Sequence, residues 1–170
     1  LAPYVYNNIQ KGVPFVIVIS QSKTKEFISL VAWPIESPDL TITAPQAYFI
    51  DEGLVMRANA ETRGLNFVIT IMISGLIDEM GMMHLNLEKI MIGSVNLTFI
   101  AKIIAKQMYQ YRVKQENYSP DNIGTDIAAS LFDNQPFGPV FEVRQRKVRV
   151  KQMYVENGQL RISLSPAIDL

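Results

Sequence analysis

The chain contains no cysteine, which excludes a disulfide, a thiol nucleophile, an iron–sulfur cluster and a zinc–thiolate site. It contains a single histidine, His84, so one chain cannot supply a multi-histidine metal site. Basic residues and acidic residues number 16 each. Because the formal charge is balanced, nothing attracts the whole molecule to nucleic acid or to acidic substrates. We therefore expect no nucleic-acid partner.

Long apolar runs are also missing. The longest is PFVIVI, residues 14–19, well short of the ~18–20 residues that cross a bilayer as a helix. The chain starts at Leu1 rather than at methionine, and we expect a signal or membrane-anchor segment upstream of it. Apolar material is nevertheless abundant, at 48% of 170 residues. This is enough for a sizeable core, so we expect a single domain over residues 1–170.

The middle of the chain predicts an antiparallel array of strands. LNFVITIMIS, residues 65–74, and MMHLNLEKIMI, residues 82–92, both alternate in polarity, as half-buried strands do. Asp51-Glu52-Gly53 predicts a tight turn between two earlier strands. Asn157-Gly158 lies between the two closing strands and is a strong hairpin signal. Runs of strands favour an α+β fold with an antiparallel sheet.

One strong helical pattern follows the strands. In NLTFIAKIIAKQMYQYRVKQ, residues 96–115, apolar residues recur three and four positions apart, which predicts a long amphipathic helix at about residues 97–114. Shorter helices are expected at residues 1–12 and 23–33. The predicted fold class is therefore α+β, with the long helix packed on an antiparallel sheet and short helices at the N-terminus. Such a sheet can leave a slot beside the helix for a small ligand.

Catalytic patterns are weak. His84 alternates with polar neighbours on its strand and has no nucleophile or orienting acid in a recognisable motif. The acidic pairs Asp51/Glu52 and Asp78/Glu79 both fall at turns, where carboxylates commonly make local hydrogen bonds. Phosphate-binding loops, calcium loops and dinucleotide fingerprints are absent from the sequence. We therefore expect a protein that is not an enzyme and that has no metal or cofactor.

A basic run, RQRKVRVK, occupies residues 144–151. Strand alternation would place Arg149 and Lys151 on one face and Val148 and Val150 on the other. The charged face is typical of a solvated sheet edge that resists aggregation. It could instead contact anionic lipid headgroups, where each cation contributes roughly 1 kcal/mol.

The eight methionines lie mainly in the predicted strands. Methionine is flexible and polarizable, and it fills irregular apolar volumes as well as ordinary cores. The strand at residues 65–74 also carries Val68 and Met72 on its second face, although a sheet with one solvated side needs only one apolar face. We expect a second apolar neighbour there, either a helix, a partner protein or a lipid chain.

A family resemblance rests on three segments: residues 42–97, the start of the predicted helix TFIAKIIAKQM, and the ending VRVKQMYVENGQLRISLSP. Their spacing of glycines and hydrophobic residues resembles that of small extracytoplasmic, membrane-anchored or lipoprotein-like bacterial proteins of the tubular lipid-binding (TULIP) type. Gly53-Leu54, Ile90 to Leu97 and Val155 to Ile162 occupy the matching places. Leu97-Thr98 stands where the family pattern has Leu-Pro. The similarity covers residues 40–110 and 140–165.

The resemblance implies a curved antiparallel sheet wrapped around the long helix, a hydrophobic groove, a lipid-related or envelope-maintenance function, and an extracytoplasmic, membrane-associated location. Our first hypothesis is non-enzymatic binding of a lipid or other hydrophobic ligand between helix and sheet, near a membrane surface that Arg149 and Lys151 could contact. The alternative is a structural or scaffold subunit of an envelope assembly, or a homo-oligomer, with the same apolar surface as a protein interface. The predicted ligand-binding residues are Phe67, Ile69, Ile71, Ile73, Leu85, Leu87, Ile100, Ile104 and Met108.

Overall fold

The structure is a computed structural model, and it describes residues 2–103, 106–107, 123–143 and 145–167. The helices are α1 (Ala2–Gln10), α2 (Gln21–Ile28) and α4 (Ile123–Asp133), and residues 98–103 and 106–107 are also helical. The strands are β1 (Phe15–Ile19), β2 (Ile35–Ser37), β3 (Leu40–Ile42), β4 (Gln46–Ile50), β5 (Gly53–Thr62), β6 (Leu65–Ile77), β7 (Met83–Ile92), β8 (Val95–Asn96), β9 (Val140–Val143), β10 (Arg146–Glu156) and β11 (Gln159–Pro166).

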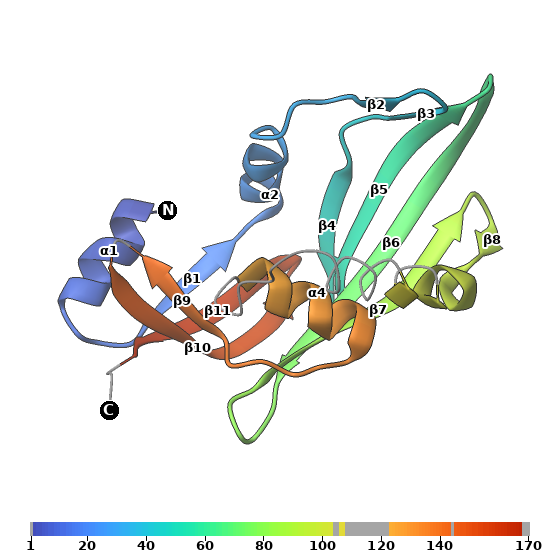
Figure 1. The fold of residues 1–170 in the computed structure, drawn as a ribbon. Coiled ribbons are helices and arrows are strands. Elements are labelled where there is room, and N and C mark those ends of the chain that lie inside the picture. Colours follow the sequence, from blue (N-terminus) through green and yellow to red (C-terminus); the bar gives the residue numbers. More distant parts are fainter. Residues whose placement is uncertain (1, 104–105, 108–122, 144, 168–170) are drawn as a thin grey trace.

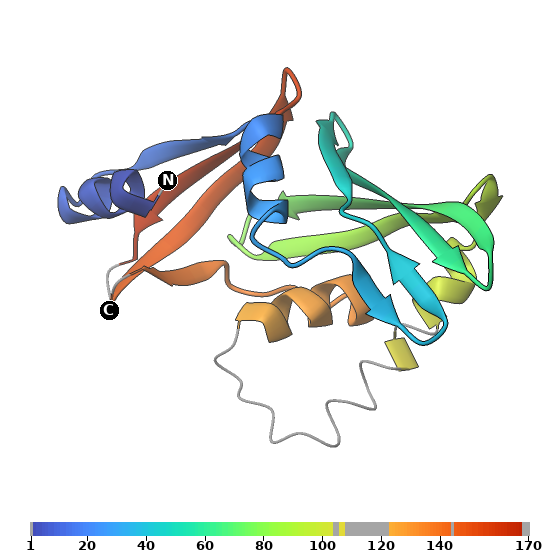
Figure 2. The ribbon, with the colours of Figure 1, turned by 90° about the horizontal axis from the view of Figure 1, so that it is seen from above.

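The strands form two antiparallel sheets (Figure 1). The small sheet has the order β1-β11-β10-β9 and therefore joins the two ends of the chain. The large sheet has the order β2-β3-β5-β6-β7-β8, and β4 also pairs with β5. Seen from above, the two sheets lie side by side, with α2 between them on one side and α4 along the other (Figure 2). The predicted antiparallel sheet is confirmed, but it is divided in two.

Both predicted hairpin turns are present. Asn157 and Gly158 have φ of 52° and 69°, the left-handed pair that a two-residue hairpin turn needs. The turn at Asp51 and Glu52 joins β4 to β5, and Gly53 follows it with φ of 144°. A Cβ atom on Gly53 would lie 2.2 Å from the carbonyl oxygen of Ile73. Only glycine therefore permits β5 to approach β6 this closely at the turn.

The main hydrophobic core lies against one face of the small sheet, and α1 covers part of this face. It includes Val5 and Ile9 from α1 and the alternating inner residues of β1, β10 and β11. Val148 is 2% exposed and Val150 is 3% exposed, and burial of each side chain contributes roughly 1.5–3 kcal/mol. Met83 at the start of β7 belongs to the same cluster. The core therefore joins the large sheet to the small one.

A β-bulge keeps the apolar side chains of β10 on one face of the small sheet, the face that contacts the core. The pairing of β10 with β11 shifts between Val150 and Gln152, so Lys151 is an additional residue in β10. Beyond the bulge, Met153 pairs with Ile162 and Val155 pairs with Leu160. The extra residue thus returns apolar side chains to the inner face that Val150 occupies.

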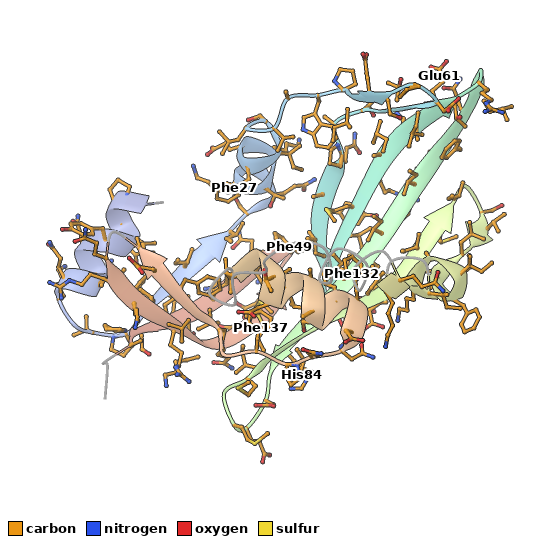
Figure 3. All side chains as sticks on the ribbon, viewed as in Figure 1. Phe27, Phe49, Glu61, His84, Phe132 and Phe137 are labelled. Carbon is orange, nitrogen blue, oxygen red and sulfur yellow. The ribbon has the colours of Figure 1, made fainter. Side chains whose placement is uncertain are left out.

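Two contacts cover the outer edge of β7. The backbones of Met83 and Phe137 exchange hydrogen bonds of 2.8 and 3.1 Å, and Figure 3 labels Phe137 at this edge. Two residues further along, the Leu85 amide donates to the Ser130 hydroxyl of α4 at 2.8 Å. Ser130 is 1% exposed. α4 therefore provides a buried acceptor for a strand amide that no neighbouring strand pairs.

The predicted fold class is wrong, because no long amphipathic helix is wrapped by a sheet among the described residues. The segment at residues 98–103 is helical, but its apolar side chains point to solvent: Phe99 is 77%, Ile100 55% and Ile103 43% exposed. The small sheet and α4 pack against the large sheet instead. Spacing three and four apart predicts an apolar stripe on a helix, but it does not say what that stripe contacts.

The short N-terminal helices are confirmed, with different limits. α2 begins after Ser20, whose hydroxyl accepts the Lys23 amide, and it ends at Ile28. Leu30 and Val31, which fall within the expected helix at residues 23–33, lie beyond α2 and are exposed. None of the described helices is both long enough and apolar enough to cross a membrane.

Candidate functional site

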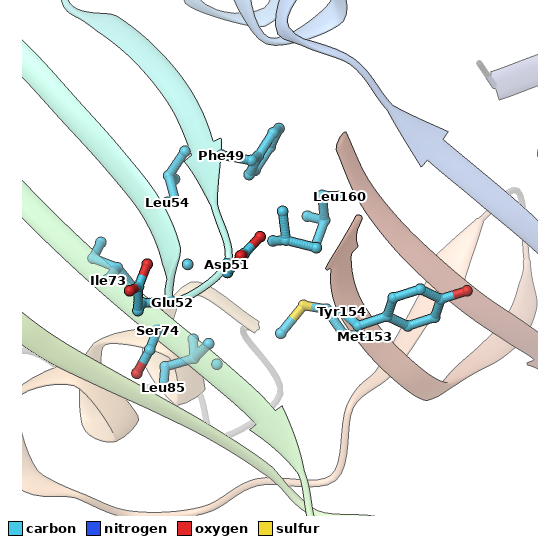
Figure 4. Close-up of a pocket in the computed structure, with 13 residues that line it drawn as sticks. Phe49, Asp51, Glu52, Leu54, Ile73, Ser74, Leu85, Met153, Tyr154 and Leu160 are labelled. Carbon is cyan, nitrogen blue, oxygen red and sulfur yellow. The ribbon is translucent and has the colours of Figure 1, made fainter. Parts of the chain in front are cut away.

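A cavity of about 360 Å³ lies between the large sheet and the small sheet. One wall is the β4–β5 hairpin with the adjoining parts of β6 and β7, and the other is the β10–β11 hairpin (Figure 4). The apolar lining residues are Phe49, Leu54, Ile73, Gly75, Leu85, Met153, Val155 and Leu160. The remaining lining residues are Asp51, Glu52, Gly53, Ser74 and Tyr154.

The faces of the strands explain why this lining is apolar. In the large sheet, Phe49 pairs with Leu54, Leu54 with Ile73, and Ile73 with Leu87. Paired residues point to the same side of a sheet, so the apolar side chains of four neighbouring strands face the small sheet. From the small sheet, Leu160 and the residues after the β10 bulge face them. The cavity is thus the unfilled part of an apolar layer between two sheets.

Gly75 lies where β6 contacts Met153 of the facing hairpin. A Cβ atom at this position would lie 2.6 Å from Cε of Met153 and 2.9 Å from Cδ2 of Leu85. Both of these atoms are the ends of flexible side chains. The missing side chain of Gly75 therefore leaves the space beside β6 that Met153 occupies in the cavity lining.

The polar groups of the lining are acidic or neutral. Asp51 and Glu52 are exposed at the β4–β5 turn, and neither makes an ion pair in the part of the chain that the structure describes. The Ser74 hydroxyl donates to the carboxylate of Glu88. Lysine and arginine are absent from the lining. The cavity therefore has an apolar interior and a rim of negative charge.

Only some of the predicted ligand-binding residues line the cavity. Ile73 and Leu85 line the cavity. Phe67, Ile69, Ile71 and Leu87 share the face of Ile73 on the large sheet but do not line the cavity. Ile100 is exposed on the helical segment that follows β8. Ile104 and Met108 lie outside the described residues.

The predicted headgroup contacts are not at the cavity. Arg149 lies beside the β6–β7 turn, where its Nη1 atom is 3.9 Å from the position that a Cβ of Gly81 would take. Lys151 is exposed at the bulge of β10. The second face of β6 carries Val68, which is partly exposed, and Met72, which is half-buried. The structure brings none of these residues into the lining.

The cavity residues that the sequence did not indicate come from the two hairpins. Phe49 and Leu54 flank the predicted turn at Asp51, but Ile50 and Val55 beside them are also apolar, so alternation did not mark the face that lines the cavity. Met153 and Val155 are different, because strict alternation from Val150 would place them on the outer face. Only the bulge reverses them.

The single histidine takes part in a local polar cluster. Nε2 of His84 lies 2.8 Å from Oδ2 of Asp78, and the other carboxylate oxygen accepts the amides of Met80 and Met82 at 2.9 Å each. The hydrogen bond from His84, with the two amides, lowers the pKa of Asp78. This arrangement holds the β6–β7 turn. Among the described residues, no group of three or more acidic or histidine side chains could hold a metal ion.

Comparison with known proteins gives no further guide, since no protein-family model, curated protein or solved structure matches the chain. Function is therefore inferred from the cavity and the residues around it.

Proposed function

We propose that the protein is a non-enzymatic binding protein that takes up the apolar part of a lipid or of another hydrophobic ligand in the cavity between the two sheets. The observation that carries this proposal is the lining itself, which combines side chains of Phe, Leu, Ile, Met and Val in one concave surface. A volume of about 360 Å³ falls within the ~300–1,000 Å³ of small-molecule sites. From the resemblance of the sequence pattern to tubular lipid-binding proteins, we also propose a membrane-associated, extracytoplasmic location.

The cavity wall is suited to ligands of varied shape. Met153 contributes a flexible side chain from the β10–β11 hairpin, and Phe49 contributes a ring from the β4–β5 hairpin (Figure 4). Apolar contacts of this kind are not directional, so affinity should follow the apolar area that the ligand buries. A chain-like ligand would lose more exposed apolar surface here than a compact polar one would.

The proposal is tested with N-phenyl-1-naphthylamine, a neutral apolar dye whose fluorescence rises when it leaves water. We expect saturable binding by the wild-type protein. Leu160→Trp fills the cavity and should weaken dye binding at least about tenfold, which is ~1.4 kcal/mol. Leu65→Trp is the matched control, because Leu65 is 69% exposed at the β5–β6 hairpin, outside the cavity lining. Equal dye binding by both variants, or no binding by the wild type, would exclude the cavity as the site.

A second function is favoured by a separate observation. Phe99, Ile100 and Ile103 form an exposed apolar surface on one helical segment, and exposed apolar patches often mark interfaces. The protein would then be a structural or scaffold subunit, or a homo-oligomer, that uses this surface. Native mass measured with and without detergent separates the two functions. If the wild-type protein and Phe99→Ser are both monomers, this surface does not form a homo-oligomer.

A further inference from the structure

The rim of the cavity carries charge of one sign. Asp51 and Glu52 occupy the β4–β5 turn, and Figure 4 shows the Asp51 side chain between this turn and Leu160 of the facing hairpin. Neither carboxylate is neutralised by an ion pair among the described residues. A ligand whose chain enters the cavity would leave its polar end beside these two groups.

Arg161, a basic side chain of the facing hairpin, does not offset this charge. Arg161 follows Leu160 in β11, and consecutive residues of a strand point to opposite faces, so Arg161 lies on the outer face of the small sheet. Its Nε atom is also already 2.7 Å from the carboxylate of Glu156. Glu88, which accepts the hydroxyl of Ser74, adds a further acidic group behind the lining. Because lysine and arginine are absent from the lining, the charged side chains at the rim are all acidic.

We propose that the cavity selects its ligand by charge and takes amphiphiles with an apolar chain and a positively charged end, which lies between the carboxylates of Asp51 and Glu52. This inference rests on the proposed function, that the cavity accepts an apolar group. Opposite charges a few ångströms apart attract, and the attraction is larger at a partly enclosed rim than in bulk water. A fatty acid or another anionic amphiphile would place its carboxylate against two like charges and bind less tightly.

Displacement of the neutral dye by three ligands of equal chain length tests the selection. The ligands are dodecylamine, dodecanol and dodecanoic acid, each used at pH 7 below the concentration at which it aggregates or separates from water. We expect dodecylamine to displace the dye at a concentration at least about tenfold lower than dodecanoic acid, with dodecanol between them. The preference should shrink as salt is raised, because exposed charges are screened within about 10 Å at 0.1 M.

The double variant Asp51→Asn/Glu52→Gln should bind the three ligands with nearly equal strength, because it removes both carboxylates of the rim. Glu36→Gln/Glu61→Gln is the control, since it removes the same net charge from β2 and β5 at the end of the large sheet where Figure 3 labels Glu61. This control should keep the wild-type preference.

The possible failures are distinguishable. If the dye does not bind and no amphiphile binds, the proposed function itself is wrong. If the dye binds but dodecanoic acid matches or exceeds dodecylamine, the cavity binds apolar groups without the proposed selection. A preference for dodecylamine that survives in Asp51→Asn/Glu52→Gln would also overturn the inference, because the charge would then act from elsewhere.

Discussion

The contact between α4 and β7 gives a prediction that can be worked from the structure. Ser130→Ala removes the hydroxyl that accepts the Leu85 amide at 2.8 Å and leaves the volume of the side chain almost unchanged. Ser130 is 1% exposed, so water cannot easily replace the lost acceptor. A buried donor left without a partner costs about 1–3 kcal/mol. We expect a loss of ~2 kcal/mol in the free energy of unfolding.

Urea denaturation followed by circular dichroism measures this loss. The midpoint should fall while the slope of the transition stays the same, because the surface exposed on unfolding does not change. A thermal midpoint should fall by about 2–4 °C for each kcal/mol in a protein of this size. Ser37→Ala is the matched control, since Ser37 donates to the Leu40 carbonyl at an exposed position. Its effect should stay within about 0.5 kcal/mol.

The reasoning would be refuted if Ser130→Ala and Ser37→Ala lowered stability equally. Such a result would mean that the Leu85 amide finds another partner, such as water, once the hydroxyl is removed. α4 would then be a peripheral helix and not a buried support for the strand that carries Leu85 into the cavity wall.

Two further predictions concern turns of the large sheet. Gly53→Ala should destabilise the fold by more than about 2 kcal/mol in urea denaturation, because its Cβ would meet the Ile73 carbonyl oxygen at 2.2 Å; Gly138→Ala, where the Cβ would meet nothing within 4 Å, should change stability little. Asp78→Asn should lose the stabilisation that accompanies the lowered pKa of Asp78, whose first cause is the hydrogen bond from His84. This difference from the wild type should be fully present above the ordinary pKa of 3.8 and should shrink as the pH falls below it; a difference independent of pH between 2 and about 6 would contradict it.

Local features were predictable where one segment of the chain determines them. Asn157-Gly158 forms its hairpin because both residues accept positive φ. The alternation in residues 65–74 placed Ile73 correctly on the inner face, since a strand has a period of two. The antiparallel pairing of β6 with β7 followed from two alternating runs separated by a short turn.

The cavity was less predictable, because its two walls are far apart in the sequence. Leu54 and Leu160 face each other only through the packing of one sheet against another. Met153 reaches the inner face through a bulge, and the pairing partner decides where that bulge lies. The apolar pattern around Ile100 was assigned to the interior, whereas the structure leaves Ile100 exposed.

The sequence by itself determined the long strands of the large sheet, the two hairpin turns and the apolar side of β6. These depend on backbone preference and on periodicity, which act over a few neighbouring residues. The tertiary structure alone decided that the closing strands form a separate sheet with β1 and that this sheet and α4 pack against the large one. It also decided that Asp51 and Glu52 stand at the rim of an apolar cavity. The physical reason is that hydrophobic burial rewards any complementary apolar face equally, so the choice of partner depends on shape and chain connectivity across the whole molecule.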